Sequence, residues 1–232
     1  MNKNLVSTVA VIPARGNSKR IPGKNLSEFG SKPALAHSIK IALDSGVFSK
    51  VLVSTEDPEI AKCASKEGAE VVNRPTELAD DYTPIMPVIV HAIQNSVPEA
   101  EVVCLVLATA ILLAPERLRD AHTTLMADPF LDYVIGVRRF DTPPQQALFL
   151  DQDGFVSMES PEMFNKRSQD LPPLYYDAAQ FSFGRREAWL QGKQSFTSRT
   201  RAIQLPRWEA IDIDEPEDLA YARLLFEAQP NK

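Results

Sequence analysis

A basic turn directly follows the first apolar run of the chain. Residues 14–25 (ARGNSKRIPGKN) hold four cations and no acid. These cations are Arg15, Lys19, Arg20 and Lys24. Gly16 and Gly23 let the backbone approach a ligand, so that main-chain amides can add to the charge-assisted hydrogen bonds of the cations. A polyphosphate suits this combination, and the alternative is a solvated basic loop.

The glycine spacing distinguishes this turn from two common phosphate-binding loops. Six residues separate Gly16 from Gly23, where a Walker loop has four. Asn25 stands where a Walker loop has the Ser or Thr that holds magnesium. The segment also lacks the G-x-G-x-x-G pattern of dinucleotide-binding loops. We therefore predict a phosphate site of another type.

Two aspartates near the C-terminus have a spacing that suits a metal ion. Residues 211–214 (IDID) alternate, so an extended segment puts Asp212 and Asp214 on one face and both isoleucines on the other. Neighbouring carboxylates suit Mg²⁺, which would share its remaining positions with phosphate oxygens and water. Alternatively, Asp214 or Glu215 caps a helix that begins at Pro216, although capping does not account for Asp212.

Seven parts of the chain match one known sequence pattern when they are taken together. They are 12–25 (IPARGNSKRIPGKN), 53–57 (VSTED), 73–81 (NRPTELADD), 164–170 (FNKRSQD), 177–181 (DAAQF), Trp189 and 211–214 (IDID). This set resembles the cytidylyltransferases that activate nine-carbon sialic-type sugar acids, and most closely their pseudaminate branch. The resemblance covers nearly the whole chain.

This resemblance implies a fold, a reaction and an assembly. The fold would be the Rossmann-like nucleotide-diphospho-sugar transferase fold. The reaction would condense CTP with a nonulosonic acid to give CMP-sugar and pyrophosphate. Pseudaminic acid is the expected nonulosonic acid. Mg²⁺ would be the cofactor, and the chain would form a homodimer.

The resemblance also assigns residues to the nucleotide and the metal. It implies catalytic roles for Arg15, Lys19, Lys24 and Asp212, and metal binding by Asp212 and Asp214. The residues expected to contact the nucleotide are Ala14, Arg15, Gly16, Asn17, Ser18, Lys19, Lys24, Asn25, Arg74 and Thr83.

Arg74 lies in the segment that the resemblance places against cytosine. A guanidinium beside a backbone carbonyl supplies donors for the ring N3 and O2 and an acceptor for the exocyclic amine, which distinguishes cytosine from uracil. The alternative is that Arg74 is a surface charge beside a turn at Pro75. Relatives have a hydroxyl residue near position 85, where this chain has Ile85. Either Thr83 replaces that contact or the contact is absent.

The segment around 167–180 would bind the acid sugar. The sugar carboxylate calls for an arginine that binds it with two hydrogen bonds, and Arg167 is the best candidate. The other expected sugar contacts are Ser168, Gln169, Asp170, Tyr176, Asp177 and Gln180. Alternatively, the same string is only a polar loop at a dimer seam.

Three departures from the family pattern bear on the substrate. Tyr176 stands where relatives have histidine and Ala179 where they have glycine, which leaves the exact sugar open. The alternatives are legionaminic, N-acetylneuraminic and 3-deoxy-manno-octulosonic acids. Ile111 stands where relatives have proline, and this change is expected to alter the backbone beside the nucleotide.

An inactive nucleotide-binding module is the alternative outside the enzymes. Such a module would serve regulation or assembly and would have no need for catalytic groups. The chain retains Arg15, Lys19, Lys24, Asp212 and Asp214, which argues against this alternative.

Strands and helices alternate along most of the chain and must position these residues. Apolar runs predict strands at 5–13, 51–54, 69–72, 102–108, 179–183 and 203–205. Apolar spacing, glycines and prolines predict helices at 32–46, 57–67, 85–95, 115–126 and 216–227. The alternation favours an α/β fold with a mainly parallel sheet and helices on both faces. Ligands of such sheets bind at the carboxyl ends of the strands, where the basic turn lies.

The composition is that of one globular domain, residues 1–232, with 44% hydrophobic and 24% charged residues. Residues 146–158 predict a β-hairpin around a turn at 151–154. We expect 140–165 to form a hairpin or dimerisation insertion in this domain.

The charge and the apolar runs exclude two classes of partner. The formal net charge of −6 argues against a nucleic-acid partner. No apolar run is long enough to cross a bilayer, so we expect a cytoplasmic protein without membrane contact. Cys63 and Cys104 have no metal-ligand spacing and are expected to be reduced core residues.

Overall fold

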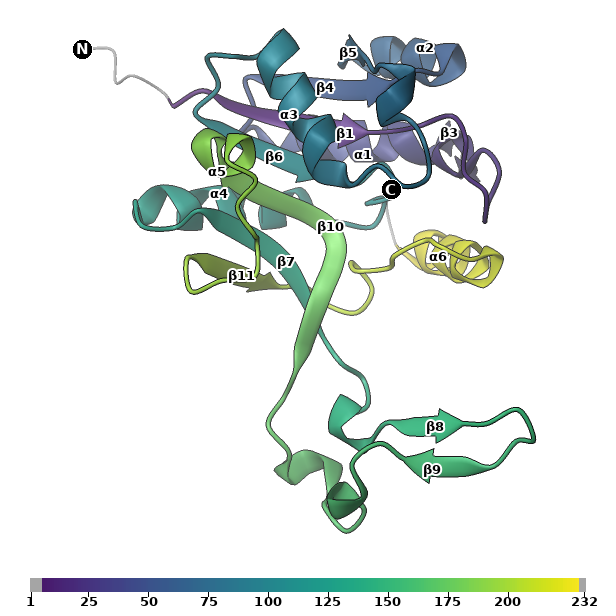
Figure 1. The fold of residues 1–232 in the computed structure, drawn as a ribbon. Helices are drawn as coiled ribbons and strands as arrows, with labels where there is room; N and C mark the ends of the chain where they lie inside the picture. Colours follow the sequence, from purple (N-terminus) through teal and green to yellow (C-terminus); the bar gives the residue numbers. More distant parts are fainter. Residues whose placement is uncertain (1–5, 230–232) are drawn as a thin grey trace.

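A seven-stranded sheet in the order β11-β7-β10-β6-β1-β4-β5 forms the centre of the molecule (Figure 1). The computed structural model describes residues 6–229. The strands are β1 (Thr8–Pro13), β4 (Lys50–Thr55), β5 (Glu70–Asn73), β6 (Val102–Val106), β7 (Tyr133–Arg139), β10 (Tyr175–Arg185) and β11 (Thr200–Gln204). Strand β10 runs antiparallel to β6 and β7, and the other pairs are parallel. The mainly parallel α/β sheet predicted from the sequence is therefore confirmed.

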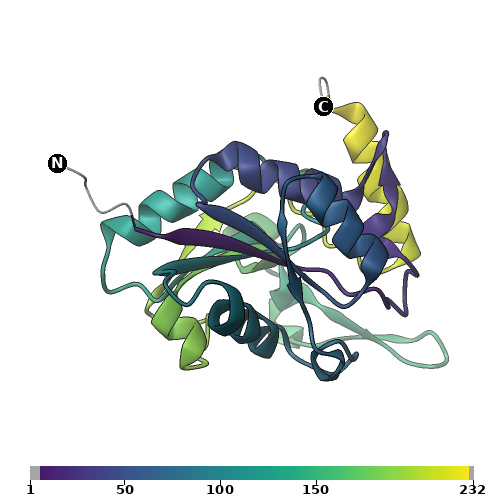
Figure 2. The ribbon, with the colours of Figure 1, turned by 90° about the horizontal axis from the view of Figure 1, so that it is seen from above.

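Helices cover both faces of this sheet. They are α1 (Ala34–Ser45), α2 (Pro58–Lys66), α3 (Ile85–Ser96), α4 (Pro115–Ala127), α5 (Arg186–Leu190) and α6 (Pro216–Ala228). Helices α1, α2 and α4 lie on one face, and α3 and α5 lie on the other (Figure 2). Within residues 6–229, no helix is long and apolar enough to cross a membrane.

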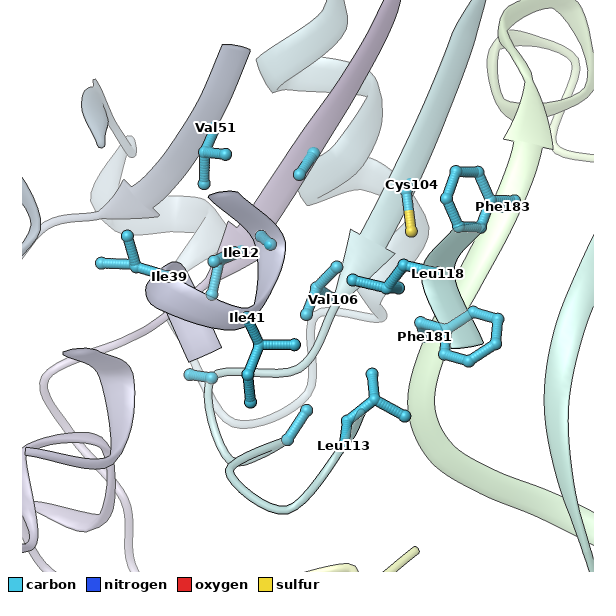
Figure 3. Close-up of a cluster of buried hydrophobic side chains, with 14 of the residues drawn as sticks. Ile12, Ile39, Ile41, Val51, Cys104, Val106, Leu113, Leu118, Phe181 and Phe183 are labelled. Carbon is cyan, nitrogen blue, oxygen red and sulfur yellow. The ribbon is translucent and has the colours of Figure 1, made fainter. Parts of the chain in front are cut away.

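The alternation of side chains along the strands divides the core into two clusters. Ala10 and Ile12 of β1 point into the cluster under α1 and α4, whereas Val9 and Val11 point into the cluster under α3. Figure 3 shows the first cluster, in which side chains of β1, β4, β6 and β10 meet those of α1 and α4. Full burial of an aliphatic side chain stabilises the fold by about 1.5 to 3 kcal/mol.

A third apolar cluster lies under α6 and joins segments that are distant in sequence. It combines Ile21 of the basic turn with Ile211, Ile213 and Phe226. Ile111, which stands where relatives have proline, is fully buried in the same cluster. This departure therefore supplies a branched side chain to the core that supports residues 211–214.

An arm formed by residues 140–174 extends from the sheet between β7 and β10 (Figure 1). It holds the hairpin β8 (Leu148–Leu150) and β9 (Val156–Met158) and three 3-10 helices. These helices are η3 (Pro144–Gln146), η4 (Pro161–Met163) and η5 (Ser168–Asp170). The predicted hairpin is present, and the arm runs beyond residue 165 to the start of β10.

Several short elements and one strand were not predicted. The short elements are helix α5, the 3-10 helices η3, η4 and η5 of the arm, and η1 (Lys24–Leu26), β2 (Glu28–Phe29), β3 (Lys32–Pro33) and η2 (Thr76–Leu78). Strand β7 was missed, and β10 is longer than the predicted 179–183. The first strand begins at Thr8, and residue 5, where it was expected to begin, lies outside the described residues.

Candidate active site

The basic turn begins where β1 ends, and its backbone is tied to the neighbouring strand. The amide of Ala14 donates to the carbonyl of Ser54 (3.0 Å), which extends the pairing of β1 with β4. The amide of Gly16 donates to Glu56 Oε1 (2.7 Å). The buried Asn25 donates from Nδ2 to the carbonyl of Arg15 (3.0 Å) and so braces the turn from its far end. These bonds fix the path of the backbone beside the cations.

Only glycine fits at position 16. A Cβ atom there would lie 2.4 Å from Asp57 Oδ2, well inside van der Waals contact. Asp57 cannot withdraw without cost, because its Oδ1 caps α2 by accepting from the amides of Glu59 (2.8 Å) and Ile60 (2.9 Å). Gly23, at the other end of the turn, has a left-handed backbone with φ of 68°.

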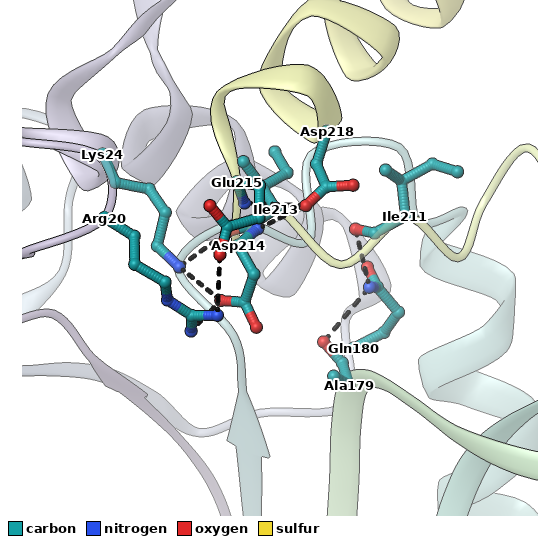
Figure 4. A network of polar contacts seen from close by, with 9 residues as sticks. All are labelled: Arg20, Lys24, Ala179, Gln180, Ile211, Ile213, Asp214, Glu215 and Asp218. Carbon is teal, nitrogen blue, oxygen red and sulfur yellow. Dashed lines mark hydrogen bonds and ion pairs between the residues drawn. The ribbon is translucent and has the colours of Figure 1, made fainter. Parts of the chain in front are cut away.

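Two carboxylates hold the four cations of the turn. Asp81 binds Arg15 Nη1 (2.6 Å) and Lys19 Nζ (2.5 Å). Asp214 Oδ1 binds Arg20 Nη2 (2.8 Å) and Lys24 Nζ (3.3 Å), as Figure 4 shows. Lys24 Nζ also donates to the carbonyl of Ile213 (2.6 Å). The structure thus brings the basic turn against residues 211–214.

The segment 211–214 has the alternation that its sequence predicts. Ile211 and Ile213 are buried, whereas Asp212 and Asp214 point to the other side. Asp214 does not cap α6, because Asp218 Oδ2 accepts from the amides of Asp214 (3.0 Å) and Glu215 (2.7 Å). Glu215 is the N-cap residue of α6 and forms a capping box with Asp218. The capping alternative is therefore confirmed for Glu215 and wrong for Asp214.

The electrostatics of Asp212 favour a cation. Burial raises the pKa of the Asp212 carboxyl, and the negative charge of Asp214 raises it further. A bound cation would relieve both effects. Within the described part of the chain, no group of three or more His, Cys, Asp or Glu side chains could by itself hold a metal ion. The Asp212 and Asp214 pair alone is thus too small a set of side chains to hold a metal ion.

Two adjoining pockets meet at the basic turn. The strand-end pocket, of about 280 Å³, lies between the carboxyl ends of β1 and β6 and the start of α3, and includes Arg74, Thr83 and Ile85. The turn pocket, of about 310 Å³, lies among the cations and includes Ser18, Lys19 and Arg20. The residues common to both linings are Arg15, Lys24, Asn25 and Asp81. Together the two pockets form one concave region that runs from the strand ends to the cations.

Arg74 is buried in the wall of the strand-end pocket, with 6% of its surface exposed. Its Nε donates to Ser54 Oγ (3.2 Å) and its Nη2 to the carbonyl of Ser54 (2.6 Å). Burial lowers the pKa of Arg74, an effect that the charge of Glu56 opposes. The alternative that Arg74 is a surface charge is therefore wrong. Thr83 lines the same pocket and donates from Oγ1 to the carbonyl of Glu77 (3.3 Å).

The expected sugar contacts fall into two groups, and three of them lie on β10. Burial raises the pKa of Asp177, although its Oδ1 accepts from the amide of Ala179 (2.9 Å). The ring of Tyr176 lies 4.8 Å from that of Phe140, between centroids. Gln180 is only 1% exposed, and its Nε2 donates to three carbonyls, including that of Ile211 (3.2 Å). This corrects the expected role of Gln180, because it supports the segment of Asp212 and has no open surface for a sugar.

The second group lies in the arm. Arg167 is largely exposed and pairs with Asp170, with 2.7 Å between Nε and Oδ2. Ser168 and Gln169 line a third pocket, of about 330 Å³, at the root of the arm. Among the described residues, none lines both this pocket and either of the other two. A single chain thus does not bring residues 167–170 into the pockets at the basic turn.

The structure adds two carboxylates that were not among the predicted site residues. Asp81 lies in the string 73–81 and Glu56 in the string 53–57, and both contact the basic turn. The sequence does indicate both residues, because each lies in a segment that matches the family pattern. Their partners are 40 and 66 residues away in sequence, so that only the fold reveals the contact.

Comparisons with known proteins identify the family of the chain. Residues 9–231 match the family described as "Cytidylyltransferase". A pseudaminic acid cytidylyltransferase of Campylobacter jejuni is 36% identical over 225 residues, which cover 95% of this chain and 97% of the relative. A CMP-N,N'-diacetyllegionaminic acid synthase of Legionella pneumophila is 30% identical over 94% of this chain and 96% of its own.

A solved structure supports the fold. The structure of CMP:2-keto-3-deoxy-manno-octonic acid synthetase complexed with CTP aligns with a TM-score of 0.70, at 18% identity. The alignment covers 95% of this chain and 98% of that structure. The chain therefore belongs to the cytidylyltransferase family of nucleotidyltransferases.

Proposed function

We propose that this chain condenses CTP with a nonulosonic acid, pseudaminic acid, to give CMP-sugar and pyrophosphate. The observation that carries the proposal is the cluster of four cations beside the pockets at the carboxyl end of β1, two of which contact Asp214 of the aspartate pair. The sugar is inferred from the 36% identity to a pseudaminic acid cytidylyltransferase over nearly the full length of both chains.

The nucleotide occupies both pockets at the basic turn in this proposal. Cytosine enters the strand-end pocket beside Arg74 and Thr83, and the phosphates lie in the turn pocket. The amides of Ala14 and Gly16 are already bonded to Ser54 and Glu56, so the expected contacts of these two residues with the nucleotide are corrected. The side chains of Asn17 and Ser18 contribute to the binding of the phosphates in addition to the cations. A buried guanidinium makes strong, directional hydrogen bonds because water does not compete for its donors.

Catalysis consists mainly of positioning and of charge neutralisation. The anomeric hydroxyl of the sugar attacks the α-phosphate in line with the leaving pyrophosphate. Arg15, Lys19 and Lys24 neutralise the phosphate oxygens and stabilise the charge on the departing pyrophosphate. Asn25 keeps Arg15 in place through the carbonyl of that residue.

Asp212 and Asp214 fit a magnesium ion in this proposal. The two carboxylates lie on one side of an extended segment beside the turn pocket, and the proximity of their charges makes a divalent cation favourable. When bound, Mg²⁺ supplies further neutralisation of the phosphate oxygens.

The arm supports a homodimer built from single-domain subunits of residues 1–232. Its exposed apolar side chains are Phe140, Leu148, Phe149, Leu150, Phe155, Val156, Phe164 and Leu174. Such a set favours burial against a partner, and a second copy of the chain is the proposed partner. The arm carries Arg167 away from the pockets of its own chain, so we assign Arg167 and residues 168–170 to the acid sugar bound by the other subunit. Tyr176 and Asp177 would contact the sugar from the body.

A substrate panel tests the proposal. Pyrophosphate release is measured with CTP, Mg²⁺ and one of four acids: pseudaminic, legionaminic, N-acetylneuraminic or 3-deoxy-manno-octulosonic acid. The highest kcat/KM is expected with pseudaminic acid. A higher kcat/KM with another acid would change the assigned sugar but leave the proposed reaction unchanged. Tight CTP binding without pyrophosphate from any of the acids would contradict the reaction and favour an inactive nucleotide-binding module.

A further inference from the structure

Asp81 holds two cations of the basic turn at once. Its Oδ1 lies 2.6 Å from Arg15 Nη1, and its Oδ2 lies 2.5 Å from Lys19 Nζ. The carboxylate lines both pockets, and it is the one acid among the described residues that line the turn pocket. It thus occupies a position between two cations where a phosphate would make the same contacts.

A turn closed by the side chain of Asp80 helps to hold Asp81 in this position. Asp80 Oδ1 accepts from the amides of Tyr82 (2.9 Å) and Thr83 (2.6 Å), which fixes a tight turn around Asp81. The carbonyl of Asp80 also accepts from Arg15 Nη1 (2.9 Å). Arg15 therefore keeps one anchor when the carboxylate of Asp81 is removed, and a neutral residue at position 81 should leave the turn in place.

The pairs with Asp81 can be exchanged for a stronger ligand. The Lys19 side chain is 72% exposed, and ion pairs at such positions are weak because water and salt compete with them. Charge-assisted bonds to a polyphosphate are stronger, since several oxygens bind together. On the other side of the turn, Asp214 holds Arg20 and Lys24 in the same way (Figure 4).

We propose that Asp81 is an internal counter-anion of the triphosphate site, which occupies the place of a phosphate between Arg15 and Lys19 and competes with the nucleotide for both. The proposal rests on the proposed function, in which these two cations bind the phosphates of CTP. Asp81 thereby sets the nucleotide affinity. It penalises only ligands whose phosphates reach Arg15 and Lys19.

Calorimetric titration of Asp81→Asn tests this proposal. The variant should bind CTP and inorganic pyrophosphate about tenfold more tightly than the wild type, whereas cytidine should bind equally to both. Asp44→Asn is the matched control, because it removes the same charge from an exposed pair with Lys40 on α1. This control should bind all three ligands as the wild type does. Thermal unfolding should show both variants folded.

A double variant separates competition from a structural role. The gain from Asp81→Asn should shrink in a Lys19→Gln background, because one of the two contested cations is then absent. Equal or weaker CTP binding by Asp81→Asn, or a parallel change in cytidine binding, would overturn the proposal and leave the cytidylyltransferase function intact. A wild-type protein that binds no CTP would overturn both.

Discussion

At the scale of the residue, the site depends on contacts between side chains from distant parts of the chain. The cations of the turn and the Asp212 and Asp214 pair could be predicted from residue type and spacing. The carboxylates that pair with these cations could not be predicted in the same way. Asp81 reaches Arg15 only because the fold brings the strand ends and the loop of residues 76–84 together. The burial of Gln180 could not be predicted from the sequence either. Its partners are backbone carbonyls, and because every residue has one, no residue type indicates the contact.

Gly16→Ala is predicted to weaken CTP binding at least about tenfold. The new Cβ would lie 2.4 Å from Asp57 Oδ2, so the turn must move away from α2 and lose the bond from the Gly16 amide to Glu56. Titration with CTP measures the effect, and circular dichroism shows whether the fold is retained. Wild-type affinity in a folded Gly16→Ala protein would contradict the close packing of this turn.

At the scale of the element, local patterns predicted most of the sheet and its helices. Strands β1, β4, β5 and β6 are apolar runs, and α1, α2, α3, α4 and α6 have the expected spacing. Strand β7 was missed because Gly136 interrupts its apolar run. Leu205 and Phe181 fill the space beside that glycine, a contact made only in the folded sheet. The antiparallel direction of β10 likewise follows from its pairing with β6 and β7.

Strand β10 also contains a strained residue that leads to a prediction. Ala179 has a left-handed backbone with φ of 48°, at an irregularity in the pairing with β7. A side chain there costs about 1 to 2 kcal/mol, and glycine avoids most of this cost. Ala179→Gly should therefore raise the free energy of unfolding by about 0.5 to 1 kcal/mol, as measured by urea denaturation.

The neighbouring alanine provides the control for this prediction. Ala178 is buried on the same strand and has no left-handed backbone. Ala178→Gly should lower the free energy of unfolding by about 1 kcal/mol, because it adds freedom to the unfolded chain and removes packing. Equal destabilisation by both substitutions would show that position 179 is not strained.

At the scale of the whole molecule, the arm separates the proposed sugar residues from the pockets of the same chain. Residues 140–174 leave the sheet after β7 and carry Arg167 with them (Figure 1). The hairpin of the arm was predicted from its turn signal. The sequence does not predict whether the arm contacts the site of its own subunit or that of its partner. The apolar side chains of the hairpin resemble those of any two-stranded unit and carry no information on this point.

Mixed dimers test whether Arg167 acts on the partner subunit. Arg167→Ala and Asp212→Asn are each expected to be nearly inactive alone. In a mixed dimer, the subunit with intact Asp212 would receive the intact Arg167 of its partner, so mixing should restore about a quarter of the wild-type activity, as expected for random exchange of subunits. Activity is measured after the two proteins are unfolded and refolded together.

The absence of restored activity, with mixed dimers present, would place Arg167 at the site of its own chain. Size-exclusion chromatography with light scattering provides the control, because it measures the dimer that both outcomes require. A monomer would contradict the role of the arm.

Pyrophosphate release by Asp212→Asn tests the central claim most directly. With pseudaminic acid as the sugar, the wild type should release pyrophosphate only when CTP and Mg²⁺ are also present. The variant should turn over at least about 100-fold more slowly, because several kcal/mol of charge stabilisation are lost, while Asp44→Asn should match the wild type. Turnover of the Asp212→Asn protein at the wild-type rate would contradict a metal-assisted transfer at the meeting point of the basic turn and the aspartate pair.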